Sequence, residues 1–217
     1  METLVIQTLN GLVFSMLLFV MAAGLSLIFG QMDVINLAHG SFYLLGGYIG
    51  FTMIRQYENY WLALIIAPVI VGTIGFIIEY AILRRIYGRH HHLNQVLFTF
   101  GLALVAADLI RWNWGSYVIT VAAPPQLQGQ VPFLGIQFPV YRLAVITFGL
   151  TIGAILWIGI ERTRIGMILR AGVSDAKLLS GFGVNIQLVF SGVFAMGTAL
   201  AALAGVIGAP IHSLYPG

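Results

Sequence analysis

Long apolar stretches alternate with short polar breaks along the whole chain, and most stretches have the length of a membrane-spanning helix. Such a helix needs about 20 mostly apolar residues to cross roughly 30 Å of hydrocarbon. The pattern therefore predicts an all-α, polytopic transmembrane helical bundle that forms a single domain over residues 1–217. About six spans are expected, over residues 12–29, 34–54, 61–83, 93–110, 138–160 and 186–207.

The composition excludes several classes of protein. Hydrophobic residues make up 59% of the 217 residues and charged residues 8%, whereas soluble domains carry about 25% charged residues. So few charges cannot cover a surface that faces water, which excludes an ordinary soluble enzyme. The 10 Lys and Arg residues against 7 Asp and Glu are too few and too dispersed to bind nucleic acid. The absence of cysteine from the sequence rules out disulfides and thiolate metal sites.

Basic residues gather in two loops and predict the orientation in the membrane. Loop 84–92 and loop 161–185 together hold seven of the 10 Lys and Arg residues. Because cytoplasmic loops carry an excess of these residues, we place both loops in the cytoplasm. The N-terminus is then external. The loop over residues 111–138 becomes an external cap, with a short extended piece expected around residues 116–121.

The polar interruption between the first two predicted spans, residues 31–41, is expected to form a broken or re-entrant element. The residues that we predict to line a substrate pathway there are Asp33, Asn36, His39, Gly40 and Ser41. The first three recur every third residue and would share one face of a helix. Polar groups inside a membrane usually face the protein interior or a water-filled path. Ser41 is expected to cap a helix that restarts there, and a simple interfacial turn with Asp33 at the water boundary is the alternative.

The sequence around this break resembles a known family. The run G-L-S-L-I-F-G over residues 24–30 is followed by V-I-N-L-A-H-G over residues 34–40 and by Gly-Gly-Tyr at 46–48. This arrangement is similar to the N-terminal signature of Liv-type branched-chain amino acid ABC transporter permeases, and within them to the first subunit of the permease pair. Thr99 belongs to a T-x-G-L element similar to that of the family and joins the predicted pathway residues. By periodicity alone, its hydroxyl would simply bond back to its own helix.

The resemblance implies a permease subunit of an ATP-driven importer in a bacterial inner membrane. Its substrates would be branched-chain or related neutral amino acids. The implied partners are a second permease subunit, two ABC ATPase subunits and an external amino-acid-binding protein, all beside membrane lipid. ATP and Mg would bind to the ATPases, so this chain is expected to be no enzyme and to hold no cofactor. Members of the family continue with further spans, and we expect the chain to lack them.

The loop over residues 161–185 combines apolar and charged residues in the pattern of a short amphipathic helix. Such a helix lies on a membrane surface or docks into a partner. The loop resembles the R-A-x-x-x-D-x-K-x-x-S-x-x-G-x-N segment of the family, which implies a coupling helix that contacts the ATPase. The implied coupling residues are Arg170, Ala171, Asp175, Lys177, Gly183 and Asn185. Leu179 departs from the family, in which a small residue is more frequent at that position.

Other signals have simpler explanations. The three histidines at 90–92 are adjacent, so their side chains diverge, and an exposed loop is favoured over a metal site. Glu79 precedes Arg84 by about one helical turn and is expected to be paired or to reach the interface. Small residues four apart predict close helix packing, within the chain or between subunits. They are Gly46 and Gly50, then Gly197, Ala201, Gly205 and Ala209.

Two other functions remain as alternatives. Permeases for urea or short amides share the same signatures, so the substrate is open within the family. An ATP-independent channel or secondary carrier is the alternative from another class. Such proteins usually depend on ionisable groups within the membrane, whereas nearly every charge here lies at the end of a predicted span.

Overall fold

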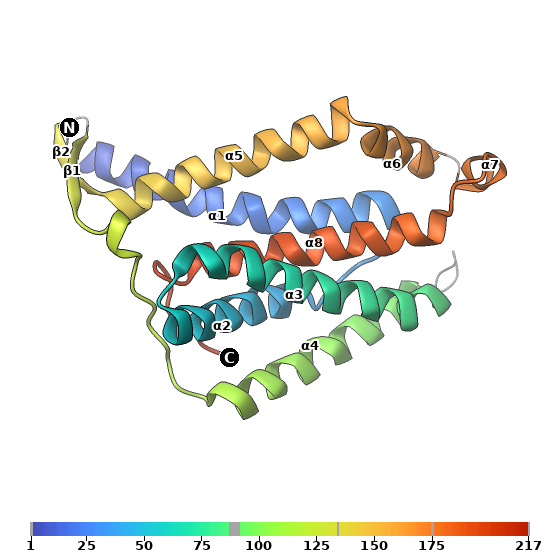
Figure 1. Cartoon of the computed structure of the whole chain (residues 1–217), viewed down its shortest axis with the longest axis horizontal. Coiled ribbons are helices and arrows are strands. Elements are labelled where there is room, and N and C mark those ends of the chain that lie inside the picture. The colour runs from blue at the N-terminus through green and yellow to red at the C-terminus, as the bar shows by residue number, and fades with distance from the viewer. Residues whose placement is uncertain (1, 87–91, 134, 175, 217) are drawn as a thin grey trace.

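The computed structural model describes residues 2–86, 92–133, 135–174 and 176–216, and these form a bundle of long helices (Figure 1). Five helices of the described part are long and apolar enough to cross a membrane. They are α1 (Glu2–Met32), α3 (Tyr60–Ala81), α4 (His92–Trp114), α5 (Val140–Arg162) and α8 (Ile186–Gly208). The all-α, multi-pass membrane fold predicted from the sequence is confirmed.

The second predicted span differs from the other five. Residues 34–54 were expected to span, but the helix here is α2 (His39–Tyr57), with 19 residues. This helix is not among the five candidate spans. The reason lies in its composition, because it begins at His39, contains four glycines and ends on a polar stretch that includes Arg55.

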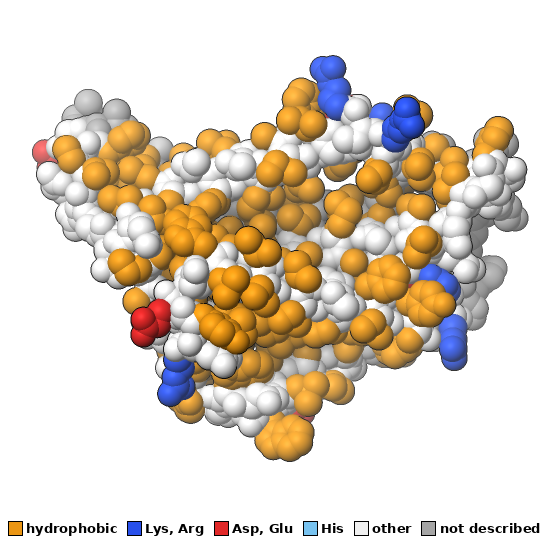
Figure 2. All heavy atoms as spheres, viewed as in Figure 1, with side chains coloured by type: hydrophobic (Ala, Val, Ile, Leu, Met, Phe, Trp, Pro, Cys, Tyr) orange, Lys and Arg blue, Asp and Glu red, His pale blue; other side chains and the backbone are white. Residues whose placement is uncertain are grey.

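Helix α8 lies at the centre of the bundle. In its most apolar stretch 61% of the residues are buried, against 11% to 33% in the other four long helices. It packs against α1, α2 and α3. Figure 1 shows α5 beside α1 at one edge and α4 at the opposite edge, with α8 between them. The outer helices therefore present most of their apolar surface to the membrane, which Figure 2 shows as broad hydrophobic areas along the helices.

Small residues allow the inner helices to approach α8 closely. A Cβ atom added to Gly24 of α1 would lie 2.5 Å from the carbonyl oxygen of Gly197, and one added to Gly46 of α2 would overlap the backbone of Ala202. Gly205 is closed in the same way by the carbonyl of Tyr43. In lipid, where helices gain little from burying apolar surface, such backbone approach is a main source of packing energy. These glycines serve packing within the chain.

A small hairpin lies beside the N-terminal end of α1 and the start of α5 (Figure 1). Its strands, β1 (Gln130–Phe133) and β2 (Ile136–Pro139), are antiparallel and follow the short helix η2 (Pro125–Leu127). The extended piece expected at 116–121 is reduced to one bridge, in which Ile119 exchanges backbone hydrogen bonds of 2.9 and 2.8 Å with Leu214. The sequence analysis did not predict the two strands of the hairpin.

Short helices lie at the other end of the bundle. Here η1 (Leu83–Arg85) follows α3, while α6 (Arg164–Ser174) and α7 (Ala176–Gly181) connect α5 to α8. Lys and Arg side chains gather near α6 and near the end of α3 in Figure 2. Basic residues at one end of the helices are the observation on which the predicted orientation depends.

Candidate functional site

The break between the first two helices extends from Asp33 to Ala38. Helix α1 ends at Met32, and Asp33 has φ of 52°, in the left-handed region that Asp tolerates better than most residues. The predicted helical face of Asp33, Asn36 and His39 is therefore wrong, because the chain is not helical over residues 33–36. Asn36 and His39 are each 3% exposed, whereas Asp33 is exposed. The structure thus separates Asp33 from the other two polar residues.

Asn36 lies at the wall of a hollow of about 430 Å³ between the break and α1. Its Oδ1 accepts a hydrogen bond of 3.1 Å from the backbone N–H of Ala38, which holds the turn before α2. Its Nδ2 is buried and has no hydrogen-bond partner among the described residues. A buried donor without a partner costs about 1–3 kcal/mol, so this amide is a candidate contact for a ligand. The hollow is lined by Leu25, Ser26, Phe29 and residues 34–37.

His39 holds α2 against α1. Its Nε2 lies 2.9 Å from the carbonyl oxygen of Met21, and because a carbonyl only accepts, the ring donates from Nε2. Its Nδ1 is buried without a partner among the described residues. A Cβ atom added to Gly24 would lie 3.2 Å from His39 Cε1. His39 does not line the hollow beside Asn36, so its main contact is between helices.

Two hydrogen-bonding side chains connect α4 to the break and to the first turn of α2. The buried Thr99 hydroxyl accepts from the backbone N–H of Leu37 at 3.2 Å, and it also lies 2.9 Å from the Gln95 carbonyl of its own helix. Ser41 donates to the carbonyl of Ala103 at 3.4 Å. The sequence predicted that Ser41 caps α2, and this prediction is wrong. The N-cap is Ala38, which forms no side-chain hydrogen bond there. The break is therefore fixed between α1 and α4.

Gly40 has a different position from its neighbours in the predicted pathway set. A Cβ atom added there would meet nothing within 4 Å. The residue therefore marks no close approach between backbones. Of the predicted pathway residues, the structure gathers Asn36, His39, Ser41 and Thr99 around the break, with Gly40 in the first turn of α2 and Asp33 on the exposed side.

The predicted coupling segment forms two helices, α6 and α7, rather than one. Arg170 lies 3.5 Å from Glu161 in an ion pair and donates to the carbonyl of Ile160, so it fastens α6 to the end of α5. Ala171 is half-buried on α6, and Lys177 belongs to α7. Asp175 lies outside the described residues.

The last two residues of this segment prepare the start of α8. Gly183 has φ of +83° in the turn after α7, a conformation that glycine adopts without strain. Asn185 is the N-cap of α8, and its Oδ1 accepts a hydrogen bond of 3.1 Å from the N–H of Leu188. Asparagine is among the preferred residues at this position. Both residues therefore have local roles in joining the segment to the central helix.

A buried polar network ties the end of α3 to the first turns of α8. Glu79 is fully buried and lies 3.9 Å from Arg84 in an ion pair, as its spacing predicted. Arg84 also donates to the hydroxyl of Ser191 at 2.9 Å and to the carbonyl of Gln187 at 3.3 Å. Ser191 donates to the Glu79 carboxylate. Sequence reasoning missed Ser191 because nothing local in the sequence indicates a contact across more than 100 positions.

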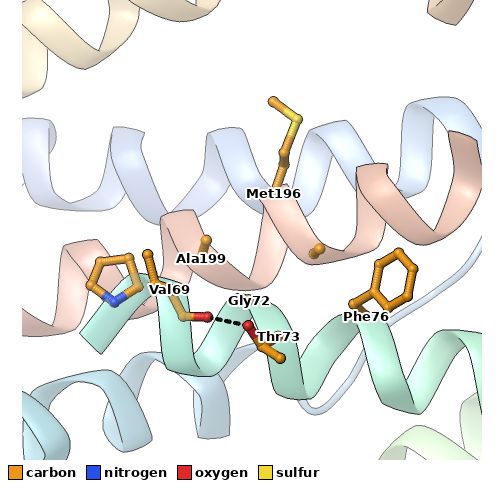
Figure 3. Close-up of a pocket in the computed structure, with 8 residues that line it drawn as sticks. Val69, Gly72, Thr73, Phe76, Met196 and Ala199 are labelled. Carbon is orange, nitrogen blue, oxygen red and sulfur yellow. Dashed lines mark hydrogen bonds between the residues drawn. The ribbon is translucent and has the colours of Figure 1, made fainter. Parts of the chain in front are cut away.

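An apolar groove of about 370 Å³ runs between α3 and α8, and Figure 3 shows its lining. The hydroxyl of Thr73 donates to the carbonyl of Val69 at 2.7 Å, which the dashed line marks. The groove therefore offers no free side-chain donor to a charged or polar solute. Its lining residues are Pro68, Val69, Gly72, Thr73, Phe76, Ala195, Met196 and Ala199.

Metal chemistry has no support in the described residues, which contain no group of three or more His, Cys, Asp or Glu side chains placed to hold a metal ion. His90 and His91 of the histidine run lie outside the described residues.

Comparison with known proteins identifies the family. Residues 7–215 match the family described as "Branched-chain amino acid transport system / permease component". The permease protein BraD of Pseudomonas aeruginosa is 28% identical over 93% of this chain and 69% of its own length. LivH of Escherichia coli is also 28% identical, over 93% of the chain and 69% of that protein. Both are named high-affinity branched-chain amino acid transport system permease proteins.

A further relative is similar over most of this chain. The probable branched-chain amino acid transport permease protein LivH of Methanocaldococcus jannaschii is 25% identical over 90% of this chain and 63% of its own length. No solved structure gives a significant match. The chain therefore belongs to the family of permease components of branched-chain amino acid transport systems.

Proposed function

We propose that this chain is one permease subunit of an ATP-driven importer for branched-chain or related neutral amino acids. The observation that carries the proposal is the Asn36 amide, which is buried without a partner at the wall of a hollow of about 430 Å³. Membership of the permease family supports the transport role. The hollow suits a neutral amino acid, because ligand pockets are mostly apolar with a few placed polar groups and enclose about 300–1,000 Å³.

The broken element would form part of the translocation path. Interrupted helices in transporters expose backbone and side-chain polar groups where they line a cavity. Here Asn36 supplies the side-chain donor, and Leu25 and Phe29 supply apolar surface for a branched side chain. Thr99 and Ser41 have a supporting role, since their hydrogen bonds hold the break and the first turn of α2 against α4. His39 sets the distance between α1 and α2 by its bond to Met21.

Coupling to ATP hydrolysis would pass through residues 161–185. Two ATPase subunits, a second permease and an external binding protein complete the proposed complex, with ATP and Mg on the ATPases. The segment suits this role because α6 packs on α1 and α5, and α7 packs on α8. A displacement imposed on short packed helices shifts the elements beside them. In this arrangement the N-terminus is external, and the segments 84–92 and 161–185 are cytoplasmic in a bacterial inner membrane.

The pathway proposal is tested by uptake of radiolabelled leucine into vesicles that contain the complete complex and internal ATP. Asn36→Leu replaces the amide with an apolar group of similar size, and we expect the ratio of turnover to KM to fall by about 5-fold or more, because an unmatched polar contact costs about 1–3 kcal/mol. Asn113→Leu makes the same change at an exposed position of α4 and serves as the control. Co-purification of the ATPases must stay unchanged in both variants. Normal uptake by Asn36→Leu would refute the pathway role.

Competition experiments separate the alternatives. Uptake of radiolabelled urea or a short amide that unlabelled leucine does not inhibit would assign the chain to the urea or short-amide permeases. Leucine uptake in liposomes without ATPase subunits would indicate a channel or secondary carrier instead. The proposed function requires uptake that depends on ATP and that valine and isoleucine inhibit.

A further inference from the structure

Three polar side chains from distant parts of the sequence surround a pocket of about 240 Å³ at the end of the bundle that carries the hairpin. Asn10 comes from α1, Arg142 from the first turn of α5, and His212 from the chain just after α8. The other lining residues are Val13, Phe14 and Ile211. This end is opposite to α6 and α7 (Figure 1), and it is therefore external in the predicted orientation.

Arg142 is the charged group of this pocket. It is half-buried, and its Nη1 donates to Oδ1 of Asn10, which is a neutral acceptor. Among the described residues Arg142 forms no ion pair, unlike Arg84, Arg111 and Arg170. A guanidinium has five N–H donors in a planar fork, and Asn10 accepts from one of them. The side chain therefore keeps its charge and most of its donors for a ligand.

The remaining walls define what kind of anion the pocket suits. The ring of His212 packs edge-on against Phe14, with centroids 5.8 Å apart and planes at 81°. Its backbone N–H donates to the carbonyl of Gly208 at 2.8 Å, so the residue is fixed at the end of α8. Val13, Phe14 and Ile211 add apolar surface next to the cation. A small ligand with one carboxylate and an aliphatic part matches both kinds of wall.

We propose that this pocket binds the carboxylate of the amino acid at the external entrance, with Arg142 as the residue that recognises it. The inference rests on the proposed function and on the predicted orientation. An arginine fork binds a carboxylate with two parallel, charge-assisted hydrogen bonds, which are stronger than its bond to the Asn10 amide. The volume lies just below the usual range of about 300–1,000 Å³ for ligand sites, so the pocket admits a small solute. A lipid phosphate offers similar chemistry to the same guanidinium and is the other source that the test must separate.

The experiment measures leucine binding to the purified complex in nanodiscs, without the external binding protein. The variant Arg142→Gln removes the charge and keeps a polar side chain, and we expect binding to weaken by about 10-fold or more, since the carboxylate loses its charge-assisted hydrogen bonds. Arg142→Lys keeps the charge but lacks the planar fork of donors. Its affinity for leucine is expected to lie between those of the unaltered complex and Arg142→Gln. Arg55→Gln removes an exposed arginine at the end of α2 and is the control.

Two analogues test the chemistry of recognition. Leucinamide lacks the carboxylate, and we expect it to compete poorly with leucine, whereas 4-methylpentanoate keeps the carboxylate and competes. In Arg142→Gln the preference for 4-methylpentanoate over leucinamide should fall by about 10-fold. Asn10→Ala keeps the cation and is expected to retain the preference, which separates loss of recognition from loss of the fold.

The outcomes distinguish this inference from the proposed function. Unchanged leucine binding by a folded Arg142→Gln complex that still transports leucine would overturn the inference alone. Native mass spectrometry gives the lipid outcome: a phospholipid retained by the unaltered complex and lost in Arg142→Gln, with leucine binding unchanged, would assign the pocket to a lipid. If Arg142→Gln bound the external binding protein more weakly but bound leucine normally, this inference would also be overturned. Failure of the proposed function would appear differently, as no ATP-driven leucine uptake by the unaltered complex.

Discussion

Replacing Arg84 by methionine tests the buried network between α3 and α8. Glu79 is fully buried, whereas the Arg84 side chain is 20% exposed, and the closest nitrogen and oxygen are 3.9 Å apart. Two unit charges about 4 Å apart interact by about 4 kcal/mol at an effective dielectric constant of about 20. Loss of one partner of a buried pair costs about 3–5 kcal/mol, because the remaining charge stays desolvated. Ser191 still donates to the carboxylate, so we expect the lower part of that range, about 3 kcal/mol.

Three further variants should differ from Arg84→Met in stability in a defined order. Glu79→Gln leaves the partly exposed guanidinium, which still reaches water, and should cost less than Arg84→Met. The double variant removes both charges, and replacing a buried pair by neutral groups is often close to neutral. We therefore expect the double variant to be more stable than Arg84→Met alone. Arg85→Met alters the neighbouring exposed arginine of η1 and should change stability by less than about 0.5 kcal/mol.

Unfolding of the purified protein in detergent, followed by thermal and denaturant transitions, measures these differences. Equal losses in Arg84→Met and Arg85→Met would refute the reasoning, since one residue joins α3 to α8 and the other is exposed. The same conclusion would follow from a double variant as unstable as Arg84→Met, because the penalty then would not come from the isolated carboxylate.

Three further predictions concern other parts of the bundle. Gly205→Ala forces a Cβ against backbone atoms and should cost about 1–3 kcal/mol, whereas Gly192→Ala on the same helix meets nothing within 4 Å and should be neutral in the same unfolding assay. Asn185→Ala removes the cap of α8 and should cost about 1 kcal/mol, visible as faster hydrogen exchange in its first turn, with Asn185→Ser as the conservative control. Tyr141→Phe should destabilise the protein more than Tyr60→Phe, because only the Tyr141 hydroxyl bonds to the carbonyl near the end of α8. The buried groups left without a hydrogen bond should cost about 1–3 kcal/mol, and equal Tm shifts would contradict this.

The helices that face lipid could be predicted from the sequence because local composition decides them. In a membrane every backbone polar group must be bonded within its own segment or barrel, so a long apolar stretch has few alternatives to a helix. Five predicted spans accordingly match long apolar helices. The second did not, because α2 contains four glycines and ends on a polar stretch that includes Arg55. The break follows the left-handed residue Asp33 directly after α1 and ends where α2 begins at His39.

The contacts that form the candidate sites could not be predicted in the same way. The bond between Thr99 and Leu37 spans 62 positions, that between Arg142 and Asn10 spans 132, and neither leaves a periodic trace in the sequence. Family motifs identified Asn36 and His39, but not which one lines the hollow. Such contacts depend on which helices become neighbours, and here the close packing of α1 and α2 on α8 decides that.

The packing of α8 has a mechanical consequence for the proposed transport cycle. Near its start, Ser191 is bonded into the network of Glu79 and Arg84, and near its end the carbonyl of Ile207 accepts from Tyr141 at 2.7 Å. Between these points, Gly197 and Gly205 lie close against backbone atoms of α1 and α2. Closely packed cores respond to force by moving between discrete arrangements rather than by continuous deformation. A displacement delivered through Asn185 at the start of α8 would therefore reach the end of the bundle that carries the hairpin as a movement of the whole helix.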